Sequence, residues 1–75
     1  MIIKVLGSGC SKCKKLEENV RKAIAEKEIV ATIEKVTEIK DIMSYGVMTT
    51  PALVIDENVV SKGKLLTVAD IVKLI

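Results

Sequence analysis

The sequence predicts one small α/β domain in which strands and helices follow the order βαβαββα. Short runs rich in β-branched residues end at glycine or at turn residues, a pattern typical of buried strands. Between these runs the apolar residues recur at three- and four-residue intervals, a pattern typical of helices that bury one face. We therefore expect residues 1–75 to form a single domain with a central four-stranded mixed sheet flanked by three helices.

The first strand and the first helix have the clearest patterns. Ile2 to Leu6 is a β-branched run with one charge, Lys4, and glycines at positions 7 and 9 follow it. A helix is expected over residues 11–27, with an apolar stripe that begins at Cys13. Its opposite face, expected to point away from the core, is charged and contains helix-supporting pairs four residues apart. The residues of that face are Lys14, Lys15, Glu17, Glu18, Arg21 and Lys22.

A second strand and a short helix are expected in the middle of the chain. Residues 29–36 are rich in β-branched residues, and a strand, a crossover helix and a second strand make a parallel pair. Thr37 is expected to be the N-cap of a short helix that Gly46 can terminate. Ile39, Ile42 and Met43 share one face of this helix and are expected to form its apolar side.

The C-terminal third predicts a hairpin and a last helix. Residues 52–55 form a strand, 56–58 a turn, and 59–61 the returning strand, which Gly63 ends. Thr67 and Asp70 have the spacing of a capping box at the start of a helix with a regular apolar face. With three helices around four strands, both faces of the sheet are expected to be covered.

Composition narrows the possible functions. A net charge of +2 with interleaved signs, and Tyr45 as the only aromatic residue, argue against a nucleic-acid partner. The absence of histidine excludes a Cys-His catalytic pair and a Cys/His zinc site within one chain. No apolar run has the length of a membrane span or of a signal peptide. We therefore expect a cytoplasmic monomer without a membrane partner.

The two cysteines of the chain, Cys10 and Cys13, form a Cys-x-x-Cys pair where the first helix is expected to begin. This spacing suits a disulfide and also suits metal binding. A cysteine at a helix N-terminus is stabilised as a thiolate by free N–H groups and by the helix dipole, and Lys12 adds positive charge nearby. Cys10 is therefore the candidate attacking thiol and Cys13, one turn deeper, the shielded resolving thiol.

These residues resemble the small thioredoxin and glutaredoxin-like redox-active disulfide proteins over nearly the whole chain. The resemblance rests on Gly9-Cys10-Ser11-Lys12-Cys13, on the segment from Gly46 to Val54, and on the element order. It implies that Pro51 is cis and lies against the cysteines, and that the backbone of Thr50 pairs with the incoming substrate strand. It implies Ser11 and Lys12 as supporting site residues. It also implies disulfide-containing protein substrates, a disulfide reductase, no metal, and no cofactor beyond the Cys10–Cys13 disulfide.

The sequence departs from the larger thioredoxins at several positions. No tryptophan precedes Cys10, and Ser11 and Lys12 stand where thioredoxins have Gly-Pro. Lys4 is the only charge of the first strand, so no counterpart is expected for the buried carboxylate that assists the resolving thiol in thioredoxins. We expect the extra N-terminal strand and helix of the full fold to be absent, and no glutathione site is identifiable.

Two other functions are compatible with a Cys-x-x-Cys pair. One is a soft-metal carrier that binds Cu(I) through two thiolates, as heavy-metal-associated domains do, although those domains follow the order βαββαβ and end in a strand. The other is a non-catalytic interaction domain in which the cysteines form a regulatory switch or an inert staple.

Overall fold

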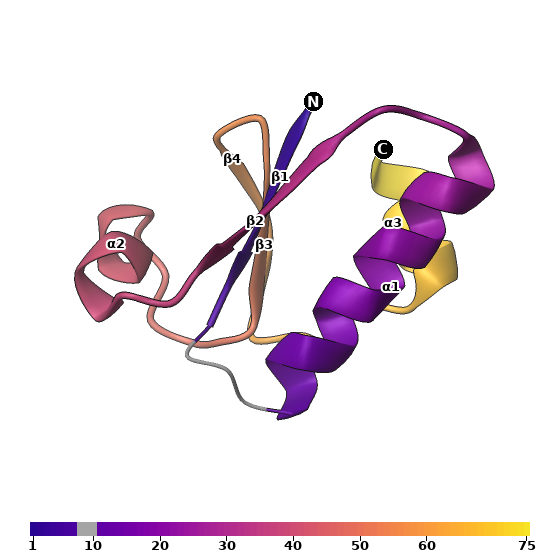
Figure 1. Cartoon of the computed structure of the whole chain (residues 1–75). Helices are drawn as coiled ribbons and strands as arrows, with labels where there is room; N and C mark the ends of the chain where they lie inside the picture. The colour runs from indigo at the N-terminus through magenta and orange to yellow at the C-terminus, as the bar shows by residue number, and fades with distance from the viewer. Residues whose placement is uncertain (8–10) are drawn as a thin grey trace.

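The computed structural model describes residues 1–7 and 11–75. The elements in chain order are β1 (Ile2–Leu6), α1 (Ser11–Lys27), β2 (Thr32–Val36), α2 (Ile39–Ser44), β3 (Ala52–Ile55), β4 (Asn58–Lys62) and α3 (Val68–Leu74). The strands form one sheet in the order β2-β1-β3-β4 (Figure 1). β1 pairs in parallel with β2 and antiparallel with β3, and β3 pairs antiparallel with β4. The predicted βαβαββα order and mixed sheet are confirmed.

Helices cover both faces of the sheet, as predicted. Figure 1 shows α1 and α3 together on one side of the sheet and α2 on the other. Alternate residues of β1 pack on the two sides of the sheet, because successive side chains of a strand point to opposite faces. Ile3 and Val5 pack with α1 and α3, whereas Leu6 packs with Ile42 of α2. Each such side chain, when fully buried, contributes about 1.5–3 kcal/mol to stability.

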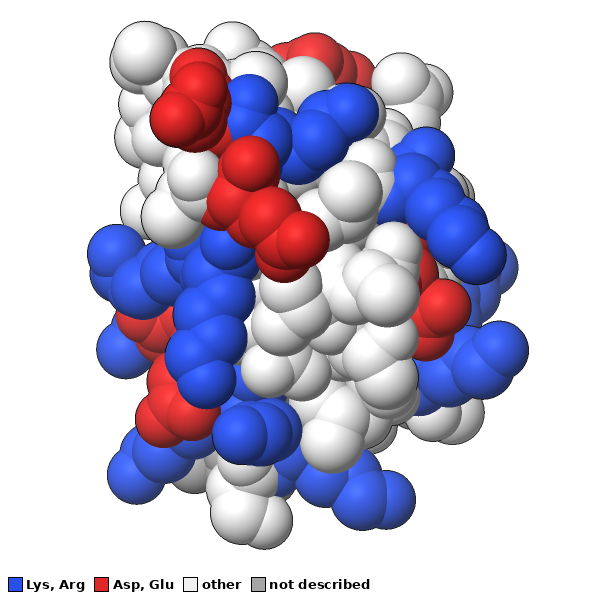
Figure 2. All heavy atoms as spheres, turned by 90° about the vertical axis from the view of Figure 1, so that its right-hand side faces the viewer, with Lys and Arg blue, Asp and Glu red and all other residues white. Residues whose placement is uncertain are grey.

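The outer face formed by α1 and α3 carries mixed charges. Figure 2 shows basic and acidic side chains on both sides of a band of uncharged residues on this face of the molecule. In the part of the chain that the structure describes, no helix is both long enough and apolar enough to cross a membrane.

The second strand is shorter than predicted. It begins at Thr32 rather than at residue 29, and the side chain of Val30 is 96% exposed. The amides of Glu28 and Ile29 donate to carbonyls of the last turns of α1, at 3.2 and 3.3 Å, so they serve the helix end and not the sheet. Pairing with β1 starts where the amide of Thr32 donates to the carbonyl of Met1, at 2.9 Å.

The prediction for α2 is partly wrong. The N-cap is Glu38, not Thr37, and the Glu38 side chain makes no capping hydrogen bond. Of the predicted apolar face only Ile42 is buried, because a helix of six residues presents little more than one side chain to the sheet. Gly46 ends the helix as predicted, with a left-handed φ of 75° and an amide that donates to the Met43 carbonyl at 2.9 Å.

The hairpin turn and the last helix form close to where the sequence predicts them. Asp56 and Glu57 both have positive φ, 47° and 68°, which is the conformation of a tight hairpin turn, so β4 already begins at Asn58. The capping box is confirmed: the amide of Asp70 donates to Thr67 Oγ1 at 3.2 Å, and the amide of Thr67 donates to Asp70 Oδ2 at 3.3 Å.

Lys4, the one charge of β1, points to the α2 side of the sheet. Its Nζ donates to the hydroxyl of Tyr45 at 2.7 Å and to Oε1 of Glu57 at 2.8 Å. The same Nζ lies 5.4 Å from the centre of the Tyr45 ring. The hydrogen bond from Lys4 holds the pKa of Glu57 below its usual range, so this pair stays charged and ties the end of α2 to the β3–β4 turn.

Asn19 is a buried polar residue of α1 that the apolar pattern did not reveal, and its Nδ2 donates to the carbonyl of Leu66 at 2.8 Å. Asn19→Ala leaves that carbonyl without its partner, so we expect the free energy of unfolding in urea to fall by about 1–3 kcal/mol. Lys22→Ala, an exposed change on the same helix, is the control and should alter it by less than about 0.5 kcal/mol. Equal effects of the two changes would show that the buried hydrogen bond adds no stability.

Candidate active site

The end of β1 brings the backbone close to a cysteine of α1. The amide of Gly7 donates to the carbonyl of Val36 at 2.9 Å, which extends the β1–β2 ladder by one residue. A Cβ atom at Gly7 would overlap Sγ of Cys13 and lie 3.1 Å from its Cβ. The sulfur can therefore lie against the strand end only because residue 7 has no side chain. The sequence predicted Gly7 as a strand terminator, whereas the structure adds this steric role.

Cys13 lies in the first turn of α1 and is 5% exposed. Its sulfur is engaged in a disulfide. Burial of this kind is the property expected of a shielded thiol. Cys10, the predicted attacking thiol, lies outside the described residues, so its role stays a prediction.

The loop before β3 reaches the same end of the sheet. The peptide bond between Thr50 and Pro51 is cis, Pro51 is buried and Thr50 is exposed. The Cβ of Thr50 lies 3.9 Å from the position that a Cβ at Gly7 would occupy. The structure therefore brings Thr50 to the place where Gly7 meets Cys13. Ser11 and Lys12 are exposed at the start of α1.

The end of β4 supports this loop. Gly63 has a φ of 62°, and a Cβ there would lie 2.8 Å from Oγ1 of Thr49. Only glycine satisfies both the left-handed backbone and this close approach. The sequence predicted Gly63 as the end of a hairpin. It did not reveal that Gly63 lies against Thr49, in the loop before β3.

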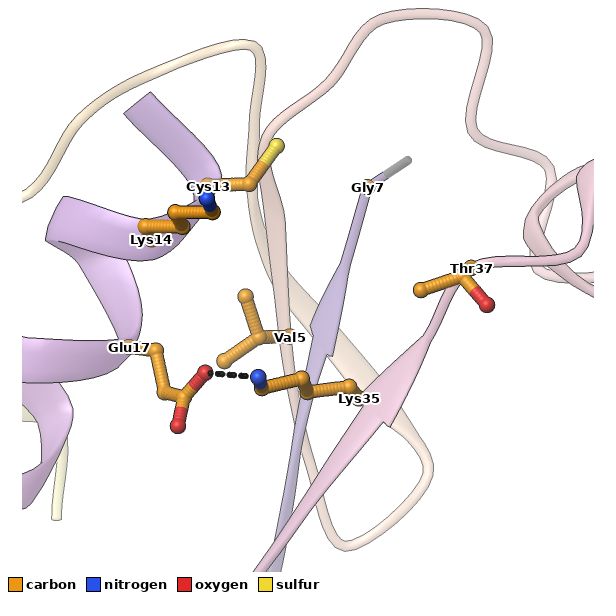
Figure 3. A pocket seen from close by; sticks show the side chains of 7 residues that line it. All are labelled: Val5, Gly7, Cys13, Lys14, Glu17, Lys35 and Thr37. Carbon is orange, nitrogen blue, oxygen red and sulfur yellow. Dashed lines mark ion pairs between the residues drawn. The ribbon is translucent and has the colours of Figure 1, made fainter. Parts of the chain in front are cut away.

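A pocket of about 120 Å³ opens beside Cys13 between α1 and β2 (Figure 3). Among the residues that the structure describes, its lining consists of Val5, Gly7, Cys13, Lys14, Glu17, Lys35 and Thr37. In this pocket Oε1 of Glu17 forms an ion pair with Nζ of Lys35 at 3.0 Å, drawn as a dashed line in Figure 3. Cys13 and this charged pair therefore line the same pocket.

The expectation that Glu17 faces solvent is wrong. Its side chain is 14% exposed, because position 17 lies one helical turn after Cys13 and Lys35 reaches across to it from β2. The predicted pair with Arg21 also forms, at 2.9 Å. Hydrogen bonds from Lys35 first, and then from Arg21, hold the pKa of Glu17 below its usual range.

A second hollow lies on the α2 side of the site. It is lined by apolar residues of α2 and of the loop before β3, and by Thr50. Met43 and Met48, two of its lining residues, are 55% and 84% exposed. The exposed Thr50 therefore has an apolar surface beside it.

Comparison with known proteins identifies the class that this fold and site define. The profile of the family described as "Thioredoxin domain" matches residues 1–75. A thioredoxin of Methanocaldococcus jannaschii is 39% identical over 71 residues, which are 95% of this chain and 81% of the relative. A thioredoxin of Methanothermobacter thermautotrophicus is 33% identical over 75 residues, which are 100% of this chain and 97% of the relative.

The chain therefore belongs to the thioredoxin family, and the predicted resemblance is confirmed. Membership supports thiol–disulfide oxidoreductase chemistry in the general sense. The element order also differs from the βαββαβ order of heavy-metal-associated domains, because a helix, α2, lies between β2 and β3.

Gly7→Ala tests the contact between the strand end and Cys13. The added Cβ overlaps Sγ of Cys13, so we expect the free energy of unfolding to fall by about 1–3 kcal/mol and the disulfide to become easier to reduce. The measurements are urea unfolding and equilibration with glutathione.

Gly46→Ala is the matched control, because Gly46 has a left-handed φ of 75° but, within residues 1–7 and 11–75, no atom lies within 4 Å of the position of its missing Cβ. In this variant the free energy of unfolding should fall by about 1 kcal/mol through backbone strain, and the redox equilibrium should not change. If Gly7→Ala also leaves the redox equilibrium unchanged, the Gly7 contact does not constrain the sulfur.

Proposed function

We propose that this protein is a thiol–disulfide oxidoreductase in which Cys10 attacks the substrate disulfide and Cys13 resolves the mixed disulfide. The observation that supports it best is the buried, disulfide-bonded Cys13 in the first turn of α1, beside the loop that carries Thr50 and the cis Pro51. Cys10 is the proposed disulfide partner, because the chain contains only these two cysteines.

The reaction consists of two exchanges. The Cys10 thiolate attacks one sulfur of the substrate disulfide, a Cys10–substrate bond forms, and the other substrate sulfur leaves as a thiolate. The deprotonated Cys13 then attacks the sulfur of Cys10, forming the Cys10–Cys13 disulfide and releasing the second substrate thiolate. The substrate gains two electrons and the protein loses two, so a disulfide reductase must return the protein to the dithiol.

The position of the pair supports these roles. A thiol at the N-terminus of a helix faces unpaired backbone N–H groups and the positive end of the helix dipole, which favour the thiolate. Lys12 and Lys14 add positive charge at the start of α1. Cys13, being buried, is protected from external disulfides and reacts only with a sulfur brought to it.

We assign the remaining roles in the same proposal. The backbone of Thr50 pairs with the substrate segment, and Pro51, Ser11 and Lys12 support the site. Residues 1–75 act as one domain that needs no cofactor beyond its own disulfide and no metal. Its partners are disulfide-containing proteins and a reductase, not nucleic acid or membrane, and it works as a cytoplasmic monomer.

Trapping the intermediate tests this function. Cys13→Ser should accumulate a mixed disulfide with a disulfide-containing protein such as insulin, because resolution is blocked, and non-reducing electrophoresis should show the adduct. Cys10→Ser should form almost none, since its remaining thiol is buried. Comparable adducts from both variants would contradict the assigned roles. A wild-type pair that oxidises but reduces no insulin would indicate a non-catalytic switch.

A further inference from the structure

The end of the molecule at which Cys13 lies carries exposed lysines on two separate elements. Lys12 and Lys14, the α1 lysines, stand on either side of Cys13 in the first turn of α1, which contains no acidic residue. Lys62 and Lys64, the hairpin lysines, are the last residue of β4 and the second residue after it. All four side chains are exposed, and none forms an ion pair within the part of the chain that the structure describes.

The strand pairing places Lys62 two strands away from the end of β1. Lys62 lies opposite Ala52 on β3, and Ala52 lies opposite Leu6, the last residue of β1. Neighbouring strands are about 4.8 Å apart, so the backbone of Lys62 lies on the order of 10 Å from that of Leu6. The hairpin lysines and the start of α1 therefore belong to the same end of the molecule.

The loop before β3 runs between the α1 lysines and the hairpin lysines. On one side, Cβ of Thr50 lies 3.9 Å from the position of a Cβ at Gly7, the residue against which the α1 cysteine packs. On the other side, Oγ1 of Thr49 lies 2.8 Å from the position of a Cβ at Gly63, the residue between the hairpin lysines. A segment that pairs with Thr50 therefore passes between lysines of both elements.

Acidic residues of the helices on the α1 side already have partners. Glu17 pairs with two cations, one on α1 and one on β2. The carboxylate of Asp70 accepts from the amide of Thr67 as part of the α3 cap. Hydrogen bonds from Thr67, and more weakly the charges of Lys73 and Lys64, hold the pKa of Asp70 below its usual range. These carboxylates therefore leave most of the positive charge around the loop unneutralised.

Acidic residues of the α2 region line a different hollow from Thr50. Glu38 and Asp41 line a polar hollow together with residues of β2. Thr50 lines the apolar hollow with Ile39 and Met43, and none of the described residues of that hollow is acidic. On the α1–α3 face, Figure 2 shows that basic side chains predominate at the lower end, where α1 begins in Figure 1. The surface around Thr50 is therefore apolar on one side and bordered by lysines.

We propose that the α1 lysines and the hairpin lysines select protein disulfides whose cysteines have acidic neighbours in sequence. The inference rests on the proposed function and names the class of substrate that it acts on. Exposed charges attract a segment of opposite sign before any contact forms and repel one of the same sign, so the selection lies mainly in the rate of association. The exchange itself is unchanged, and the substrate still gains two electrons from the cysteine pair.

Two cyclic peptides with one disulfide provide the probe. They differ only at four positions beside the cysteines, which are glutamate in one peptide and glutamine in the other. The reduced protein is mixed with excess peptide, and acid quenching followed by chromatography gives the rate constant of reduction. Because acidic neighbours also change the reactivity of a disulfide, each rate constant is divided by that for dithiothreitol, a dithiol without other charged groups.

The wild-type protein should reduce the glutamate peptide about tenfold faster than the glutamine peptide at an ionic strength of about 10 mM. This preference should fall to about twofold or less at about 0.5 M salt, because screening shortens the Debye length from about 30 Å to less than 10 Å. A preference that is absent, or that salt leaves unchanged, would overturn the inference.

Lys62→Gln/Lys64→Gln tests the surface without changing the charges at the start of α1. This double variant should lower the preference for the glutamate peptide about threefold. Lys22→Gln/Lys27→Gln is the matched control, because it removes two exposed charges from later turns of α1, and it should lower the preference by less than about 1.5-fold. Equal losses in the two double variants would show that net charge, and not this surface, sets the preference.

Lys12→Gln/Lys14→Gln tests the α1 lysines in the same way. This double variant also changes the charge beside the cysteines, which affects both peptides alike, so only the ratio of the two rate constants reports the selection. That ratio should fall about threefold. An unchanged ratio would contradict the role of the α1 lysines.

Failure of the proposed function gives a different result. A wild-type protein that reduces neither peptide, while dithiothreitol reduces both, would contradict thiol–disulfide exchange itself. Reduction of both peptides at equal corrected rates would leave that function standing and would overturn only the selection of acidic partners.

Discussion

The contact between Gly7 and Cys13 is the constraint on which the geometry of the site depends. β1 is a central strand, hydrogen-bonded to β2 on one side and to β3 on the other, so its end is firmly placed. Because Gly7 has no side chain, α1 can begin with the Cys13 sulfur against that end. The same strand end lies beside Thr50, so one backbone position gathers parts of α1 and of the loop before β3.

Charges are divided between the two faces of the sheet. On the α2 side, Lys4 joins Tyr45 and Glu57 and ties the hairpin turn to the helix end. On the α1 side, Glu17 and Lys35 pair at the pocket beside Cys13. β1 contains no carboxylate, whereas α1 contributes Glu17 to the pocket that Cys13 also lines.

Local patterns predicted most of the fold, because β-branched runs, glycine ends and the Thr67–Asp70 capping box act within a few residues. They failed where a partner distant in sequence decides the outcome. Glu17 was expected to face solvent. Its ion pair with Lys35 could not be foreseen, because it forms only when the crossover brings β2 beside α1. The burial of Asn19 depends on the carbonyl of Leu66, and the role of Gly63 depends on Thr49. Cys13, Thr50 and Pro51 could be predicted together only through the family resemblance, because no local pattern brings them into proximity.

The reduction potential of the Cys10–Cys13 pair tests the central claim most directly. Equilibration of the protein with glutathione or dithiothreitol buffers, followed by quantification of the free thiols, measures it. A thiol–disulfide oxidoreductase should lie between about −120 and −270 mV, the range of known enzymes of this chemistry. A potential well below about −300 mV would mark an inert structural disulfide and would contradict a function in redox exchange.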